Sequence, residues 1–266
     1  MIGRMALSES ELAELAQAKR LLEHPGIAAR LAAVAGSPLE KGMKLLPAGW
    51  RDKVNDATRA ALEKALDVAV SSLGSRGATP SRDRLHKIMA AASGAAGGAF
   101  GLPALAIELP ISTTVMLRSI ADIAAANGED PRDAATRLAC LTVFALGSTK
   151  DRADDAAESG YFAARSALAA AVTEATKHIA QKGVAKGGAP ALVRLIALIA
   201  ARFGIVVSEK AAAQAIPIIG AAGGALVNTV FINHYQDMAR GHFTVRRLER
   251  LHGTEAVRAA YEGAAP

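Results

Sequence analysis

Apolar residues recur along most of the chain at the three- to four-residue spacing of amphipathic helices. The first such segment covers residues 8–23, where Ser8 and Glu11 have the spacing of a capping box at a helix start. The same pattern predicts short helices that begin at Ile27 and Pro38. Segments with the two-residue alternation of β-strands are nearly absent, so the pattern favours a helical protein.

A long amphipathic helix is predicted over residues 51–73, and the Gly-, Ser- and Pro-rich residues 74–81 are the best linker candidate. Two Gly-rich apolar segments follow, at residues 88–107 and 211–233. A proline shortens each of them to about 22–24 Å of helix, against a hydrocarbon core of about 30 Å. A third apolar segment, residues 190–207, carries two arginines. An apolar bundle is therefore favoured, and a membrane-spanning protein stays open as the alternative.

The composition agrees with close packing of helices. The 266 residues include 62 alanines and 24 glycines, whereas aromatic residues make up only 4%. Ala is the best helix former, and small side chains let helix backbones approach one another. We predict an all-α, single-domain bundle of about ten helices over residues 1–266, with Gly/Ala-rich apolar helices at its centre.

The formal net charge is +6, and half of this excess lies in residues 240–258. This amphipathic, basic stretch is predicted to contact an anionic membrane through Arg240, Arg246, Arg247 and Arg250. The alternative is a solvated terminal helix that docks by its apolar side. No nucleic-acid-binding motif accompanies the charge, so nucleic acid is not expected as a partner.

A smaller amphipathic patch lies near the start of the chain. Lys41 and Lys44 are followed closely by Leu45, Leu46 and Trp50. Trp50 is assigned to the predicted membrane surface, because such a patch can anchor a protein at a membrane interface. A helix packed on the bundle is the alternative and is favoured over the anchor.

Several polar residues in apolar surroundings are candidates for ligand binding: Glu108, Arg118, Asp122, Asp154, Glu158, Tyr161, Arg165 and Asn228. A buried charge must find a partner or shift its pKa. Glu108 and Arg118 are therefore predicted either to hold a ligand headgroup or to join two helices as an ion pair, with the ion pair favoured. Glu158, Tyr161 and Arg165 share a helix face and are predicted to complete this cluster.

The sequence predicts no metal and no cofactor. Asp154 and Glu158 are one turn apart and could share a divalent ion, but attraction to a helix N-terminus explains them better. No HExxH, GxSxG, Walker or GxGxxG motif is present. The lone Cys140 lies in an apolar helical context and is predicted to be a buried thiol.

Three blocks occur in a fixed order: ELPISTTVMLRSIADIA at residues 108–124, DDAAESGYFAAR at 154–165, and AIPIIGAAGGALVN at 215–228. They are followed by Phe243, Arg247, Leu248 and residues 253–257. Together they resemble the EcsC protein family over about residues 39–261, which makes residues 1–38 an N-terminal helical extension. The resemblance implies a bacterial, mostly helical, hydrophobic protein with membrane association. The family is named for a gene beside a bacterial ABC transporter, and the resemblance supplies no established reaction.

We therefore expect a non-enzymatic protein, peripheral on the cytoplasmic side of the plasma membrane, which binds lipid or another apolar ligand or supports a membrane transporter. The cytoplasmic expectation rests on the lack of a secretory signal pattern. One alternative is an enzyme acting on a lipid-like anionic substrate, with Glu108 or Glu158 as acid/base and Arg118 or Arg165 holding the anionic group. A structural scaffold without a ligand is the other.

Overall fold

The computed structural model describes residues 7–23, 26–72, 102–147, 160–182, 189–216 and 220–264. These residues form ten α-helices and one short 3-10 helix, and they contain no strand, which confirms the all-α prediction. The α-helices are α1 (Glu9–Glu23), α2 (Ile27–Ala35), α3 (Leu39–Leu45), α4 (Trp50–Ser72), α6 (Leu102–Ala126), α7 (Ala134–Thr142), α8 (Gly160–Lys182), α9 (Pro190–Gln214), α10 (Gly220–His252) and α11 (Thr254–Gly263).

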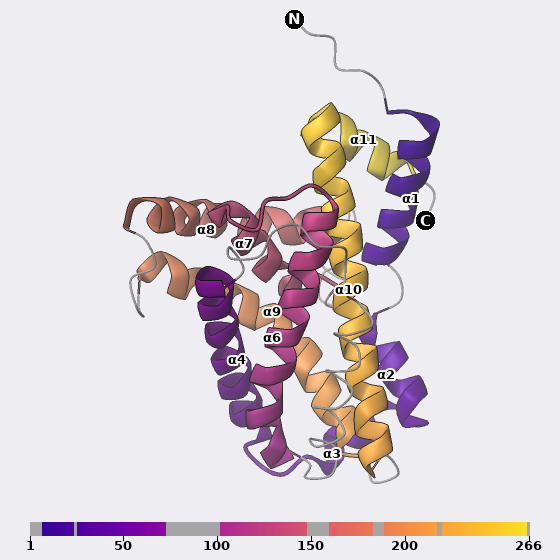
Figure 1. Ribbon diagram of the computed structural model, residues 1–266. Helices are drawn as coiled ribbons and strands as arrows, with labels where there is room; N and C mark the ends of the chain where they lie inside the picture. The colour runs from indigo at the N-terminus through magenta and orange to yellow at the C-terminus, as the bar shows by residue number, and fades with distance from the viewer. Residues whose placement is uncertain are drawn as a thin grey trace, which may run out of the picture.

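Helix α10 organises the bundle. Its 33 residues span about 50 Å at 1.5 Å per residue, and Figure 1 shows it running from the bottom of the bundle to the top. Helices α1, α2, α6, α9 and α11 all pack against it. Helix α8 packs against the first part of α9, and Figure 1 shows this pair projecting to one side of the bundle.

Two ends of the bundle can be distinguished along α10. The basal end, at the bottom of Figure 1, holds α3, the last turn of α9 and the first turns of α4, α6 and α10. The distal end, at the top, holds α1, α11 and the last turns of α10. Because α9 ends and α10 begins within a few residues of each other, these two helices run in opposite directions.

Small residues set how closely the helices approach. A Cβ atom on Gly42 of α3 would lie 2.0 Å from the backbone oxygen of Ala212, so only glycine lets α3 rest on the last turns of α9. A Cβ atom on Gly241 of α10 would lie 2.6 Å from Leu22 Cγ and 3.0 Å from the oxygen of Ala18. Glycine therefore permits the contact between α1 and α10 as well.

The few aromatic residues fill the centre of this alanine-rich core. Phe144, Phe203, Phe231 and Tyr235 are fully buried, and their neighbouring ring centroids lie 5.1–6.0 Å apart. Cys140 is buried nearby on α7, as predicted, and burial raises the pKa of its thiol to about 12. A thiol with such a pKa is un-ionised and inert near neutral pH.

The observed helix ends agree with the sequence pattern at the start of the chain and between α9 and α10, whereas α6 differs from it at one proline. The predicted capping box forms: Ser8 N–H donates to Glu11 Oε2 at 2.8 Å, and Glu11 N–H donates to Ser8 Oγ at 3.3 Å. Helix α6 continues through Pro110, eight residues after its start. As its proline predicted, the apolar segment over residues 211–233 is not one helix, because α9 ends at Gln214 and α10 begins at Gly220.

Among the described residues, two helices are long and apolar enough to cross a membrane: Leu105–Ala126 and Pro190–Gln214. In the first, 61% of the most apolar window is buried in the protein, whereas in α9 only 39% is buried. Val193 and Leu198 are among the large apolar side chains that α9 leaves exposed. Residues 88–101 of the Gly-rich apolar segment predicted at 88–107, and the linker candidate at 74–81, lie outside the described residues.

Candidate functional site

Glu108 forms a buried ion pair inside the basal end. Its Oε1 atom accepts a hydrogen bond of 2.6 Å from Nζ of Lys210 on α9, and the two side chains are 4% and 0% exposed. Gln214 donates to the other oxygen of Glu108 at 3.5 Å. The Lys210 Nζ also lies 4.7 Å from the ring centroid of Phe231 on α10. The buried ammonium group of Lys210 on α9 thus contacts residues of both α6 and α10.

The Glu108 carboxylate and the Lys210 ammonium group stabilise each other in the buried site. Burial lowers the pKa of Lys210, while the carboxylate of Glu108 offsets part of this effect by its charge and hydrogen bond. Removing one partner would leave a single charge in a site closed to water, which is far less favourable than the pair. The ion-pair interpretation of Glu108 therefore fits its surroundings, but its partner is Lys210 and not the predicted Arg118.

Glu209, next to Lys210, has no such partner. Its Oε2 atom is buried without a hydrogen bond, and burial raises the pKa of this carboxyl to about 7. The Tyr235 hydroxyl, whose pKa is raised by burial and by the charge of Glu209, is also buried without a hydrogen bond. The interior of the basal end thus holds one cation and two carboxyls.

Tyr161 and Arg165 meet, as their spacing predicted, but in a second cluster. Arg165 donates to both oxygens of Glu249 at 2.9 and 3.0 Å and to the Tyr161 hydroxyl at 3.2 Å. That hydroxyl lies 3.0 Å from Nδ1 of His242. Burial and the nearby arginines lower the pKa of His242 well below its ordinary value, so the ring is neutral. The hydroxyl accepts from Arg165 and can therefore donate its own proton to Nδ1.

The single cluster predicted from Glu108 to Arg165 is not formed. Phe231, beside the Glu108 pair, and His242, beside Tyr161, are eleven residues apart on α10, which is about 16 Å along the helix. Arg118 lies ten residues after Glu108 on α6, about 15 Å away. Two groups this far apart cannot hold one small headgroup. The predicted enzyme with Glu108 as acid or base gains no support, since both oxygens of Glu108 have partners.

The remaining candidates are spread over several parts of the chain. Arg118 and Asp122 are partly exposed on the outer side of α6. Asn228 is buried on α10, three residues before Phe231. Asp154 and Glu158 lie outside the described residues, and no group of three potential metal ligands is found in the described part of the chain.

The arginines predicted to contact a membrane turn toward acidic partners in the protein. Arg246 donates to both oxygens of Glu129 at 2.9 and 3.1 Å, and Arg250 pairs with the same carboxylate. Burial alone would raise the pKa of Glu129, but the hydrogen bonds and charges of these arginines outweigh it and lower that pKa. Arg247 pairs with Glu14, and Arg240 pairs with Asp237 at 3.0 Å. The positive charge of the distal end is therefore largely matched inside the molecule.

Exposed apolar side chains gather at the basal end. Nine large apolar residues are exposed in the described chain, and four of them lie there: Met43, Leu45, Ile107 and Leu226. Ile107 is 72% exposed, Leu45 56% and Leu226 55%. Ile111, one turn farther along α6, is exposed too. Ile107 directly precedes Glu108, so one turn of α6 carries both an exposed apolar side chain and a member of the buried ion pair.

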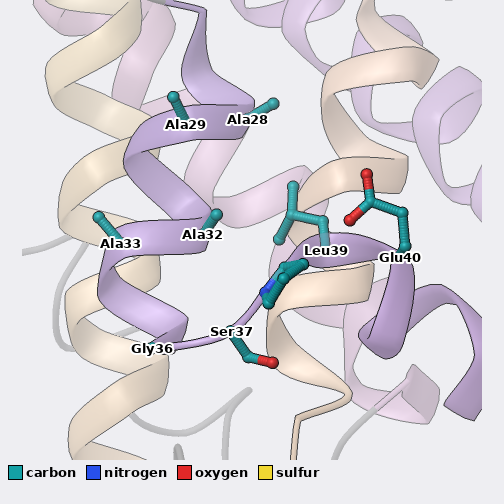
Figure 2. A pocket seen from close by; sticks show the side chains of 9 residues that line it. Ala28, Ala29, Ala32, Ala33, Gly36, Ser37, Leu39 and Glu40 are labelled. Atoms are coloured by element: carbon teal, nitrogen blue, oxygen red, sulfur yellow. The ribbon is translucent and has the colours of Figure 1, made fainter.

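A groove of about 640 Å³ lies between α2 and α3. Figure 2 shows the alanines of α2 on one side and Leu39 and Glu40 of α3 on the other. Apart from Ser37 and Glu40, the side chains that line it are apolar and mostly small. No residue predicted from the sequence to bind a ligand lies in this groove, and it holds no cluster of groups suited to catalysis.

Sequence reasoning missed Lys210, Glu209, His242 and Glu249 as members of polar clusters. One signal for the first two was present, because Ser208, Glu209 and Lys210 interrupt the apolar part of α9 that follows Arg202. A search of the curated proteins and of the solved structures finds no match. A comparison with protein families matches residues 9–248 to the EcsC protein family. This match covers most of the chain, from α1 to near the end of α10, and the chain belongs to the EcsC protein family.

Proposed function

We propose that the protein is a non-enzymatic, membrane-peripheral protein that contacts lipid through the basal end of its bundle. The observation that carries this proposal is the group of exposed apolar side chains there: Met43, Leu45, Ile107 and Leu226. Single exposed apolar residues are common on soluble proteins, whereas a group of them is typical of an interaction surface. Trp50, partly exposed at the start of α4, adds an aromatic side chain of the kind found at membrane interfaces.

The expected contribution to vesicle binding follows from the apolar surface that the lipid would cover. Burial of a whole Leu or Ile side chain contributes about 1.5–3 kcal/mol, so removing the exposed half from water contributes about 1 kcal/mol. Leu45 and Leu226 together would then strengthen vesicle binding by about 2 kcal/mol, or roughly thirtyfold. Such apolar contact persists in high salt, unlike binding through surface charges alone.

The interior of the protein favours a second candidate, a structural scaffold without a ligand. The Glu108–Lys210 pair is closed to solvent, and the aromatic core around Phe203 is filled. Both are features of a packed bundle and not of an internal ligand site. The two candidates differ outside the core, since only a lipid-binding protein uses the apolar basal surface.

The cytoplasmic side of the plasma membrane and a transporter partner belong to the proposal as well, and the transporter partner rests on what the family resemblance implies. Fractionation of cells expressing the tagged chain tests the first: recovery with membranes and release by carbonate are expected. Copurification of a membrane transporter after detergent extraction tests the second.

Flotation with phosphatidylcholine vesicles at high salt tests the lipid-contact proposal. The variant Leu45→Asn/Leu226→Asn should bind about thirtyfold more weakly than the unmodified protein. The control is Leu12→Asn/Leu251→Asn, which changes two leucines of similar exposure at the distal end and should bind like the unmodified protein. Equal losses in both variants, or no flotation of the unmodified protein, would reject the proposal and leave the scaffold.

A further inference from the structure

Helix α3 presents two different faces. Leu39 and Gly42 are buried, and Gly42 rests against the backbone of Ala212 in α9. The other side exposes Met43 and Leu45. Lys41 and Lys44 are exposed on the same short helix. An exposed face that mixes apolar and lysine side chains suits the boundary between water and lipid, where lysine stems lie on apolar surface and the ammonium groups reach headgroups.

The cations near α3 differ from those of the distal end because no acid among the described residues forms an ion pair with them. Lys41, Lys44 and Lys53 make no ion pair in the described part of the chain, and Arg51 lies over the Trp50 ring at 5.7 Å. Four cations and two acids, Glu40 and Asp52, occur between residues 39 and 53, which gives a local charge of +2 (four minus two). The charge of this surface is therefore available to an external anion.

We propose that the segment from Leu39 to Lys53 is the binding site for anionic phospholipid headgroups. This inference rests on the proposed function and adds the lipid class and the residues that recognise it. Lys41 and Lys44 contact headgroup phosphates, while Leu45 and the Trp50 ring enter the adjoining apolar layer. Gly42 positions the site, because it alone lets α3 sit against α9.

The chemistry of the surface favours a lipid bilayer over a free anion. Lys41 and Lys44 are exposed side chains on a convex helix and do not surround a pocket. The two lysines would bind a single soluble phosphate only weakly. An anionic leaflet, in contrast, presents many negative charges in one plane, and both lysines can interact with it. Each lysine near such a leaflet contributes about fivefold to binding, and the pair about thirtyfold.

The experiment compares the full chain on two kinds of vesicle at physiological salt: phosphatidylcholine alone, and phosphatidylcholine mixed with phosphatidylglycerol. The unmodified protein should prefer the anionic vesicles. The variant Lys41→Gln/Lys44→Gln should bind anionic vesicles about thirtyfold more weakly and neutral vesicles unchanged. The matched control is Lys64→Gln/Lys177→Gln, which removes two exposed lysines from α4 and α8 away from the basal end.

Support for the site requires that the anionic preference falls in the first variant and persists in the control. Equal binding of the unmodified protein to both vesicles would overturn the lipid class and leave the proposed function standing. Equal losses in the two variants would overturn the location, because the overall charge would then explain the preference. No binding to either vesicle would reject the proposed function together with this inference. Circular dichroism of both variants checks that they are folded.

Discussion

The basal and distal ends of the bundle both carry positive charge, but in different surroundings. At the distal end, Arg246 and Arg250 converge on Glu129, and Arg247 reaches Glu14 on α1. At the basal end, Lys41 and Lys44 stand beside exposed apolar residues and have no acidic partner in the described chain. The first arrangement joins helices to one another. The second leaves charge and apolar surface together for an external partner.

At the basal end, charged residues at the surface also differ from charged residues in the interior. Directly after the exposed Ile107, Glu108 turns into the interior and forms an ion pair with Lys210. Where water is excluded, a charge needs a partner within the protein, whereas at the surface solvent can serve. The number of charged residues in a segment is therefore a poor predictor of a binding surface. Whether each charge has a partner within the protein is more informative.

The largest effect is expected from breaking the buried basal pair. Lys210→Met leaves Glu108 charged in a closed site and should lower the free energy of unfolding by about 3–5 kcal/mol. Urea unfolding followed by circular dichroism measures it. Glu108→Gln/Lys210→Met removes both charges and should recover most of the lost free energy of unfolding. If Lys210→Met does not fold, a folded double variant still tests the prediction. A loss below about 1 kcal/mol in the single variant would show that the pair is not essential.

A smaller effect is expected at the distal end. Glu129→Gln removes the charge that Arg246 and Arg250 share, and it should lower the free energy of unfolding by about 2 kcal/mol, as for charge-assisted hydrogen bonds. The control Arg247→Gln breaks the more exposed pair with Glu14 and should cost less than about 1 kcal/mol. If the two variants were equally destabilised, the ion pairs of Glu129 would not be the main stabilising contacts of the distal end.

The unpaired carboxyl of Glu209 predicts a pH dependence for the basal interior. Its pKa is about 7 in the folded protein against 4.5 ordinarily, so the folded state binds a proton in this window that the unfolded chain releases. The contribution of Glu209 to stability therefore decreases as pH rises from 4.5 to 7. Glu209→Gln should stabilise the protein by about 2 kcal/mol at pH 8 and by much less at pH 5. Unfolding in urea at both pH values measures this, and an equal change at both would contradict it.

Local features of the fold could be predicted well from the sequence. The capping box of Ser8 and Glu11 forms as its spacing indicates, because the groups involved are only three residues apart. The helices that begin near Ile27, Pro38 and Trp50 follow in the same way from apolar spacing. Helix α6 is an instructive difference: it continues through Pro110 although proline removes one backbone hydrogen bond.

The candidate site was predicted less well. Glu108 was correctly singled out, but its partner Lys210 lies 102 residues away in sequence and was not considered. Tyr161 and Arg165 were correctly placed together, since they are one helical turn apart, whereas Glu249 and His242 join them only through the packing of α8 and α10. The basic stretch near the C-terminus was recognised, but the acids that neutralise it lie on distant segments.

The sequence alone determined that this protein is helical, where its first four helices begin, and that it belongs to the EcsC protein family, because these properties depend on local spacing and on residue identity. Only the tertiary structure decided which charges are paired and which apolar side chains remain exposed. Such pairing depends on which helices come within hydrogen-bonding distance. For Arg246 and Glu129, 117 residues apart, that distance is set by the packing of the whole bundle.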